Sequence, residues 1–122
     1  MSDQRDQPSL DELAARLAEF ARLRDWDQFH APKNLAMALA GEVGELLEHF
    51  QWLTEQQSAN LPAETKDAVA LEMADVLLYL VRLADKLKID LGAAAVRKIG
   101  LNAAKYPIDK FRGSSRKYDD PT

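Results

Sequence analysis

The chain has 122 residues, no cysteine and a formal net charge of −4 at pH 7, and 47% of its residues are hydrophobic. A chain of this length predicts one domain with a hydrophobic core. The negative charge argues against a binder of nucleic-acid polymers, because neutralising phosphates requires a cationic surface. A chain without cysteine has no disulfide framework and no thiolate metal site, which suits a cytoplasmic protein.

The N-terminal segment, residues 1–8, is polar and predicts a disordered start to the chain. Its polar and acidic character is wrong for a secretory signal. The longest strongly apolar run, Val76 to Val81, ends at Arg82 and is far shorter than the roughly 20 residues that span a bilayer. We therefore expect no membrane association.

The first helix is predicted from a capping box formed by Ser9 and Glu12. Apolar residues follow at helical spacing as far as Phe20, and the helix should end near Arg24. The next segment, residues 25–31, is aromatic and irregular. Pro32 suits the first turn of a second helix.

The second and third helices each carry a stripe of apolar residues that predicts a core. In the second helix the stripe consists of Leu35, Leu39, Val43, Leu46 and Phe50. In the third helix, which Pro62 should open and which should run to about Lys88, it consists of Val69, Met73, Val76, Leu80, Leu83 and Leu87. The polar stretch between the two helices, residues 54–61, is predicted to be a loop.

Asp90 can cap a fourth helix, which should run from Leu91 to about Lys105. Residues 107–122 predict a basic, flexible tail, and residues 9–106 form the helical domain. No strand pattern is present, so the fold class is all-α, a four-helix bundle with short connections. The second and third helices are apolar over much of their circumference, which predicts a homo-oligomer, at least a dimer.

Two pairs of acidic residues lie inside these largely apolar helices. Glu42 and Glu45 form the first pair, and Glu72 and Asp75 form the second. Residues three apart share a helix face, so two facing helices would bring four carboxylates together. Because clustered, buried like charges are costly unless a cation neutralises them, the pairs predict a divalent metal site.

The ligand type restricts the metal. Carboxylates favour the hard cations Mg²⁺, Mn²⁺ or Ca²⁺. Of these we expect Mg²⁺, with Mn²⁺ as a possible substitute. The Glu-x-x-His motif of di-iron bundles is absent, since Glu45 and Asp75 stand where the histidines would be. Mg²⁺ held by a few carboxylates usually completes its shell with water and phosphate oxygens, which predicts a phosphate-bearing substrate.

Other residues fit such a substrate. Lys98, Asn102 and Lys105 lie on one side of the fourth helix, and the tail adds Arg116 and Lys117. The four cations of this set would face the phosphates, opposite the metal. Trp26, Phe29, His30 and Trp52 offer flat faces on which a base can stack. Each of these residues also has a plain structural interpretation, as a solvated cation, a disordered tail or a core aromatic.

The sequence resembles the MazG-like all-α nucleotide pyrophosphohydrolases. Their signature, Glu-Glu-x-x-Glu, a spacer and Glu-x-x-Asp, matches Glu42, Glu45, Glu72 and Asp75, with 26 residues between Glu45 and Glu72. Gly41 replaces the first Glu of the signature, a change that the subgroup of dCTP pyrophosphatases also tolerates. The segments Arg24–His30, Pro32–Leu35, Phe50–Trp52, Asp75–Val81, Asn102 with Lys105–Pro107, and Ser114–Tyr118 resemble that subgroup too.

The resemblance implies Mg²⁺-dependent hydrolysis of a nucleoside triphosphate to a monophosphate and pyrophosphate. It also implies dCTP or a modified dCTP as substrate, a role in clearing unwanted nucleotides, and a homodimer or homotetramer. The metal would be held by Glu42, Glu45, Glu72 and Asp75. The residues that would bind the base, sugar and phosphates of the substrate are Trp26, His30, Asn34, Trp52, Tyr79, Lys98, Asn102, Lys105, Tyr106, Arg116 and Lys117.

Our mechanistic hypothesis is that a metal-activated water attacks the α-phosphorus in line. Glu45 helps to remove the proton of this water, and Glu42, in the same acidic group, is the second candidate catalytic residue. Two alternatives stay open. The first is an enzyme like the phosphoribosyl-ATP pyrophosphohydrolases, which has no evident use for the two tryptophans. The second is a non-catalytic helical interaction module, which predicts neither a metal requirement nor turnover.

Overall fold

The computed structural model describes residues 7–120, and the helical prediction is confirmed: these residues contain helices and no strand. The elements, in chain order, are α1 (Leu10–Leu23), the short 3₁₀ helix η2 (Asp27–Phe29), α2 (Pro32–Glu48), α3 (Glu55–Ala59), α4 (Ala63–Lys86), α5 (Leu91–Lys105) and α6 (Ile108–Phe111). Most of the predicted disordered N-terminus lies outside the described residues. The chain divides at residues 89 and 90 into two compact units.

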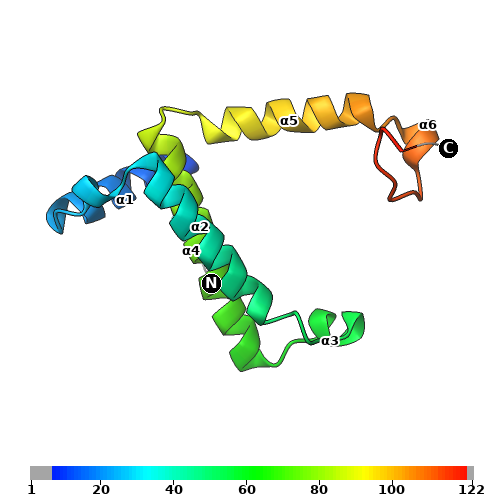
Figure 1. The fold of residues 1–122 in the computed structure, drawn as a ribbon, viewed down its shortest axis with the longest axis horizontal. Coiled ribbons are helices and arrows are strands. Elements are labelled where there is room, and N and C mark those ends of the chain that lie inside the picture. Colours follow the sequence, from blue (N-terminus) through cyan, green and yellow to red (C-terminus); the bar gives the residue numbers. More distant parts are fainter. Residues whose placement is uncertain (1–6, 121–122) are drawn as a thin grey trace. The chain divides into compact units, whose positions relative to one another are not determined.

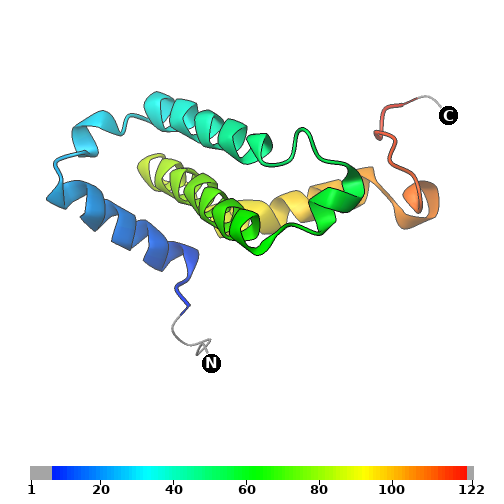
Figure 2. The ribbon, with the colours of Figure 1, turned by 90° about the horizontal axis from the view of Figure 1, so that it is seen from below.

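In the first unit α4 is the central helix and contacts both α2 and α1. Figures 1 and 2 show α2 and α4 side by side and running in opposite directions. The side chains of Leu35 and Val69, one from each predicted core stripe, are buried at 2% and 7% exposure. Ala21, Val81 and Ala84 are also buried. This antiparallel pair brings the acidic segments of the two helices opposite each other.

The predicted core stripes are only partly buried. Val43 on α2 is 47% exposed and Met73 on α4 is 57% exposed, so placing them in the core of the single chain was wrong. Their side chains lie on faces of α2 and α4 that no helix of the first unit covers. Both helices are apolar on more than one side, and one contact between two helices covers only one of those sides.

A Schellman motif ends α1 and turns the chain toward α2. The backbone N–H of Trp26 donates to the carbonyl of Ala21 at 2.9 Å, and that of Asp25 donates to Arg22 at 3.1 Å. Asp25 takes the left-handed conformation that this motif needs, with φ of 53°. The indole of Trp26 then packs edge-on against Phe20, with ring centroids 5.7 Å apart. The end of α1 therefore fixes the position of this tryptophan.

The segment after α2 was predicted to be a loop, and here the prediction was wrong. Residues 55–59 form α3, because Thr54 and Gln57 make a reciprocal capping box. The Thr54 hydroxyl accepts from the Gln57 backbone N–H at 3.1 Å, and the Gln57 side chain accepts from the Thr54 N–H at 2.9 Å. The Thr-x-x-Gln spacing was visible in the sequence and is the signal that was missed.

The second unit consists of α5, α6 and the segment that follows them. Asp90 caps α5 as predicted, accepting from the backbone N–H of Ala93 at 3.0 Å. The aromatic rings of Tyr106, Phe111 and Tyr118 meet edge to face. The predicted basic tail thus contains a short helix, α6, joined to an aromatic cluster. No helix within residues 7–120 is long and apolar enough to cross a membrane.

Replacing Leu35 with Ala should lower the free energy of unfolding by about 2–5 kcal/mol, because a nearly fully buried side chain leaves a cavity. Urea titration followed by circular dichroism measures the change. The matched control is Leu23→Ala, since Leu23 is 66% exposed at the end of α1. Equal losses in the two variants would contradict the packing described here.

Candidate active site

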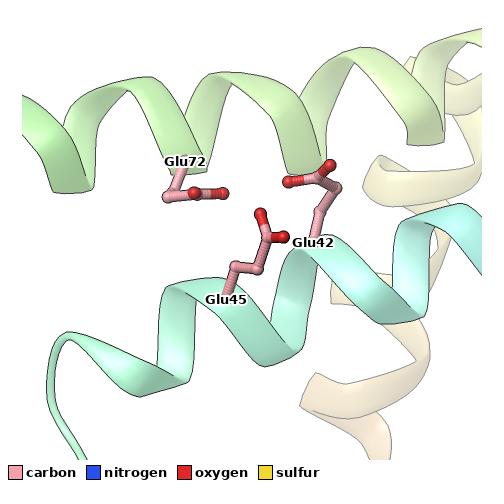
Figure 3. A group of neighbouring side chains, drawn as sticks. All are labelled: Glu42, Glu45 and Glu72. Atoms are coloured by element: carbon pink, nitrogen blue, oxygen red, sulfur yellow. The ribbon is translucent and has the colours of Figure 1, made fainter.

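Three carboxylates meet where α2 faces α4. Glu42 and Glu45 project from α2 toward Glu72 on α4, as Figure 3 shows. One oxygen from each residue lies within 4.8 Å of the other two. The i, i+3 spacing on α2 puts Glu42 and Glu45 on one helix face, and the contact of the two helices adds Glu72. The structure thus brings three of the four predicted metal ligands into one group.

The donor atoms of this group fit a divalent cation. Oε2 of Glu42 and Oε2 of Glu72 are buried and accept no hydrogen bond from any described residue. Buried carboxylate oxygens without partners are unfavourable, and a hard cation is the partner that would satisfy them. With one oxygen from each within 4.8 Å of the others, Glu42, Glu45 and Glu72 are the residues that would hold such an ion.

The close approach of these carboxyl groups changes the pKa of Glu42. The pKa of Glu42 is raised to about 7, and burial is the largest cause. The carboxyl groups of Glu45 and Glu72, which can share its proton, also contribute to this shift, and so do the negative charges of Glu45 and Asp75. Without a cation, Glu42 therefore holds a proton close to neutral pH.

Asp75, the fourth predicted ligand, lies apart from the group of three but acts on Glu42 through its charge. Its side chain lines an open cavity of about 430 Å³ between α1, the segment before α2, the start of α2, and α4. Asp75, Tyr79 and Arg82 line this cavity from one stripe of α4, because positions i, i+4 and i+7 share a helix face. Asp75 therefore connects the carboxylates with the cavity.

The cavity holds three of the predicted base-binding or sugar-binding residues, namely Trp26, His30 and Tyr79. The residues that sequence reasoning missed are mainly on α1: Leu13, Arg16, Leu17 and Phe20 also line it. Apart from Arg16, they follow the apolar period of that helix and carry no separate functional signal. Trp52 does not line this cavity and is 87% exposed. Asn34 donates to the carbonyl of Phe29 at 3.2 Å, which holds the chain before α2.

The predicted phosphate-binding residues lie in the second unit. Lys98, Asn102 and Lys105 occupy α5. The ammonium of Lys105 lies 4.8 Å from the ring centre of Tyr118, and the guanidinium of Arg116 lies 5.1 Å from that of Phe111. Tyr106 belongs to the same aromatic cluster, and the backbone N–H of Lys117 donates to Asp120 at 2.9 Å. The cluster therefore holds two of the cations at defined positions.

Comparison with known proteins agrees with this site. The model of the MazG-like family matches residues 38–120, which include all four acids. The chain belongs to the MazG-like family. The prediction that it is a nucleoside triphosphate pyrophosphohydrolase of this family is confirmed.

The relatives of this MazG-like protein match it over most of its length. It is 45% identical to dCTP pyrophosphatase 1 from Rattus norvegicus and from Homo sapiens, over 93% of this chain and 68% of each relative. The crystal structure of a pyrophosphatase from Archaeoglobus fulgidus is 38% identical and superposes with a TM-score of 0.77, covering 87% of this chain and 99% of that one. This likeness supports the all-α fold predicted from the sequence.

The acidic group predicts how stability depends on pH when metal is removed. Folding raises the pKa of Glu42 from an ordinary value of 4.5 to about 7, so the folded state binds the proton more tightly. The resulting stabilisation is present below about pH 4.5 and is lost as the pH rises through about 7. Urea unfolding in chelator across this range should show the loss, and Glu42→Gln should show less of it. The same pH dependence in both proteins would show that the carboxyl group of Glu42 is not its cause.

Proposed function

We propose that this protein hydrolyses dCTP or a modified dCTP to the nucleoside monophosphate and pyrophosphate in a Mg²⁺-dependent reaction that clears unwanted nucleotides. The observation that carries the proposal is the pair of buried, unpartnered oxygens of Glu42 and Glu72, next to a cavity with aromatic walls. The dCTP pyrophosphatases that resemble this chain support the choice of substrate.

The metal would be held by Glu42, Glu45 and Glu72, with Asp75 as a further ligand. Only carboxylates are present in the group, and such a set favours Mg²⁺, or Mn²⁺ as a substitute, over softer metals. When bound, the ion would polarise the phosphates and lower the pKa of a coordinated water. The residues around it would orient the triphosphate.

Glu45 is our candidate for the general base. It belongs to the group of three but is the most exposed of them, so solvent can reach its carboxylate. Its oxygens are also not among the buried atoms that lack a partner. Glu42, with its raised pKa, would hold a proton near neutrality until the cation displaces it. Glu45 is therefore the carboxylate better placed to take a proton from water.

The cavity lined by Trp26, His30 and Tyr79 would take the base and sugar. Its walls are mostly apolar and aromatic, with a few polar groups, as small-molecule sites usually are. Stacking on an indole contributes about 1–3 kcal/mol per base. The roles of Asn34 and Trp52 in binding, and of Lys98, Asn102, Lys105, Tyr106, Arg116 and Lys117 at the phosphates, remain predictions from the sequence.

We also expect the enzyme to work as a homodimer or homotetramer. Large apolar side chains project from both central helices: Met37 on α2 is 63% exposed and Leu71 on α4 is 64% exposed. Apolar residues this exposed on packed helices support an association with further chains. A cytoplasmic location stays a prediction from the sequence.

Pyrophosphate release from a panel of nucleoside triphosphates tests the proposed reaction. Release should require Mg²⁺, stop in chelator, and be fastest with dCTP or a modified dCTP. Glu42→Gln should lower the rate by more than about a hundredfold, because even residues that only support metal ligands cost about tenfold to a hundredfold. No release from any nucleotide would overturn the proposal, and preference for another base would overturn the choice of substrate.

Replacing Trp26 with Ala should raise KM for the preferred nucleotide by about tenfold or more, because a stacking surface of the cavity is lost. Phe29→Ala is the matched control, since Phe29 lies in the same connecting segment, is 60% exposed and does not line the cavity. Steady-state kinetics of both variants measure the difference. Equal effects on KM would show that the cavity is not the base site.

A further inference from the structure

Arg82 is a buried cation in an otherwise apolar part of α4. It is 5% exposed, and its neighbours in sequence are Val81 and Leu83. A buried guanidinium is unfavourable unless its N–H groups find acceptors. Nη2 of Arg82 donates to Asp27 at 2.7 Å, Nε donates to Nδ1 of His30 at 3.1 Å, and Nη1 contacts Asp85 at 3.4 Å.

The partners of Arg82 fix it in place. Asp27 also accepts from the ammonium of Lys86 at 3.0 Å, so two cations of α4 hold one carboxylate of η2. The hydrogen bond from Lys86, and then the charges of Lys86 and Arg82, lower the pKa of Asp27. The carboxylate therefore stays charged at neutral pH, and the segment between α1 and α2 is tied to α4 across 55 residues of sequence.

The contact between Arg82 and His30 has only one possible direction. A guanidinium has donors and no acceptor, and it stays protonated in proteins. Nδ1 of His30 must therefore accept, so it carries no proton. Turning the imidazole by half a rotation would place a ring C–H against the Nε–H of Arg82, which makes no hydrogen bond. A neutral ring with an unprotonated Nδ1 carries its one proton on Nε2.

The surroundings of His30 also keep the ring neutral. Burial is the largest factor that lowers the pKa of His30. The positive charges of Arg82 and Lys86 lower it further, and only Asp27 opposes them. A neutral imidazole has one donor and one acceptor, and Arg82 uses the acceptor.

We propose that Arg82 is a positioning residue that locks His30 in the tautomer protonated at Nε2, so that the cavity offers an N–H donor to an acceptor on the base. His30 and Arg82 both line the cavity of about 430 Å³. The remaining polar atom of the ring is then a donor, which favours a carbonyl oxygen or an unprotonated ring nitrogen. The inference rests on the proposed function, because it assigns the cavity to a base.

The tautomer is measurable without activity. Two-bond ¹H–¹⁵N correlation spectra of the ¹⁵N-labelled protein, above the ordinary histidine pKa, report the protonation of each ring nitrogen. For His30 we expect an unprotonated Nδ1, a protonated Nε2 and a scalar coupling from Nε of Arg82 to Nδ1. His49, the second histidine of the chain, serves as the internal reference. A proton on Nδ1, or averaged shifts like those of a free imidazole, would overturn the proposal.

Substitutions at and near Arg82 test whether this residue fixes the tautomer of His30. Arg82→Met removes all the donors and should give averaged ring shifts for His30. The matched control is Asp85→Asn, which removes the longest contact of Arg82 but leaves its Nε–H on His30. This control should keep the native tautomer. If Arg82→Met does not fold, the spectra of the native chain and the kinetic comparison below still test the proposal.

Two replacements of His30 distinguish its two possible roles, as a hydrogen-bond donor in the cavity and as a purely structural partner of Arg82. Asn places an oxygen near the position of Nδ1 and keeps an acceptor for Arg82 but no donor beyond it. Gln places its amide nitrogen near the position of Nε2 and keeps the donor. We expect His30→Asn to raise KM for dCTP by about threefold to tenfold more than His30→Gln, with kcat changed similarly in both.

A larger rise in KM for His30→Gln, or equal values, would show that His30 only supports Arg82. If the native chain releases no pyrophosphate from any nucleotide, the proposed function fails while the spectra still report the tautomer. If activity is present but Nδ1 carries the proton, the proposed function stands and the role of Arg82 falls.

Discussion

The packing of α2 on α4 forces acidic side chains together, and the arrangement of the site depends on this contact. Each helix carries its carboxylates on a face that is otherwise suited to burial, so packing the apolar residues also packs the charges. Glu42 and Glu72 are left with buried oxygens that no described residue satisfies. A cation bound between these carboxylates would stabilise the fold, and the apolar contact between the helices fixes where that cation would sit.

Helix α4 connects this acidic group with a second polar centre. Glu72 contributes to the carboxylates, while Arg82 and Lys86, further along the helix, hold Asp27. Asp75 and Tyr79 lie between the two centres and line the cavity. One rigid helix therefore sets the spacing between the group proposed to bind metal and the wall proposed to bind the base, and no loop intervenes in that spacing.

Much of this arrangement could be predicted from periodicity. The caps and the helical spacing placed α1, α4, α5 and the start of α2 to within about two residues, because those signals are local. The end of α2 was placed too late, since the helix ends at Glu48, before Phe50 of its predicted stripe. The stripe of Glu72, Asp75, Tyr79 and Arg82 also follows from helical geometry alone. The pairing of Arg82 with Asp27 could not be predicted, since it joins segments far apart in sequence and depends on how α1 ends. The exposure of Val43 and Met73 shows a further limit: an apolar period marks a face to be covered but does not say what covers it.

The Schellman motif at the end of α1 has a consequence for how such an enzyme diversifies. It places Trp26 through backbone hydrogen bonds to Ala21, and the carboxylates of α2 and α4 take no part in it. Insertions or substitutions between residues 23 and 31 would reshape one wall of the cavity and leave the acidic group untouched. The wall proposed to bind the base and the group proposed to bind metal thus belong to separable parts of the first unit, and Asp75 lies between them. If these two roles are right, selection could change the nucleotide that is recognised without altering the residues proposed to act in its cleavage.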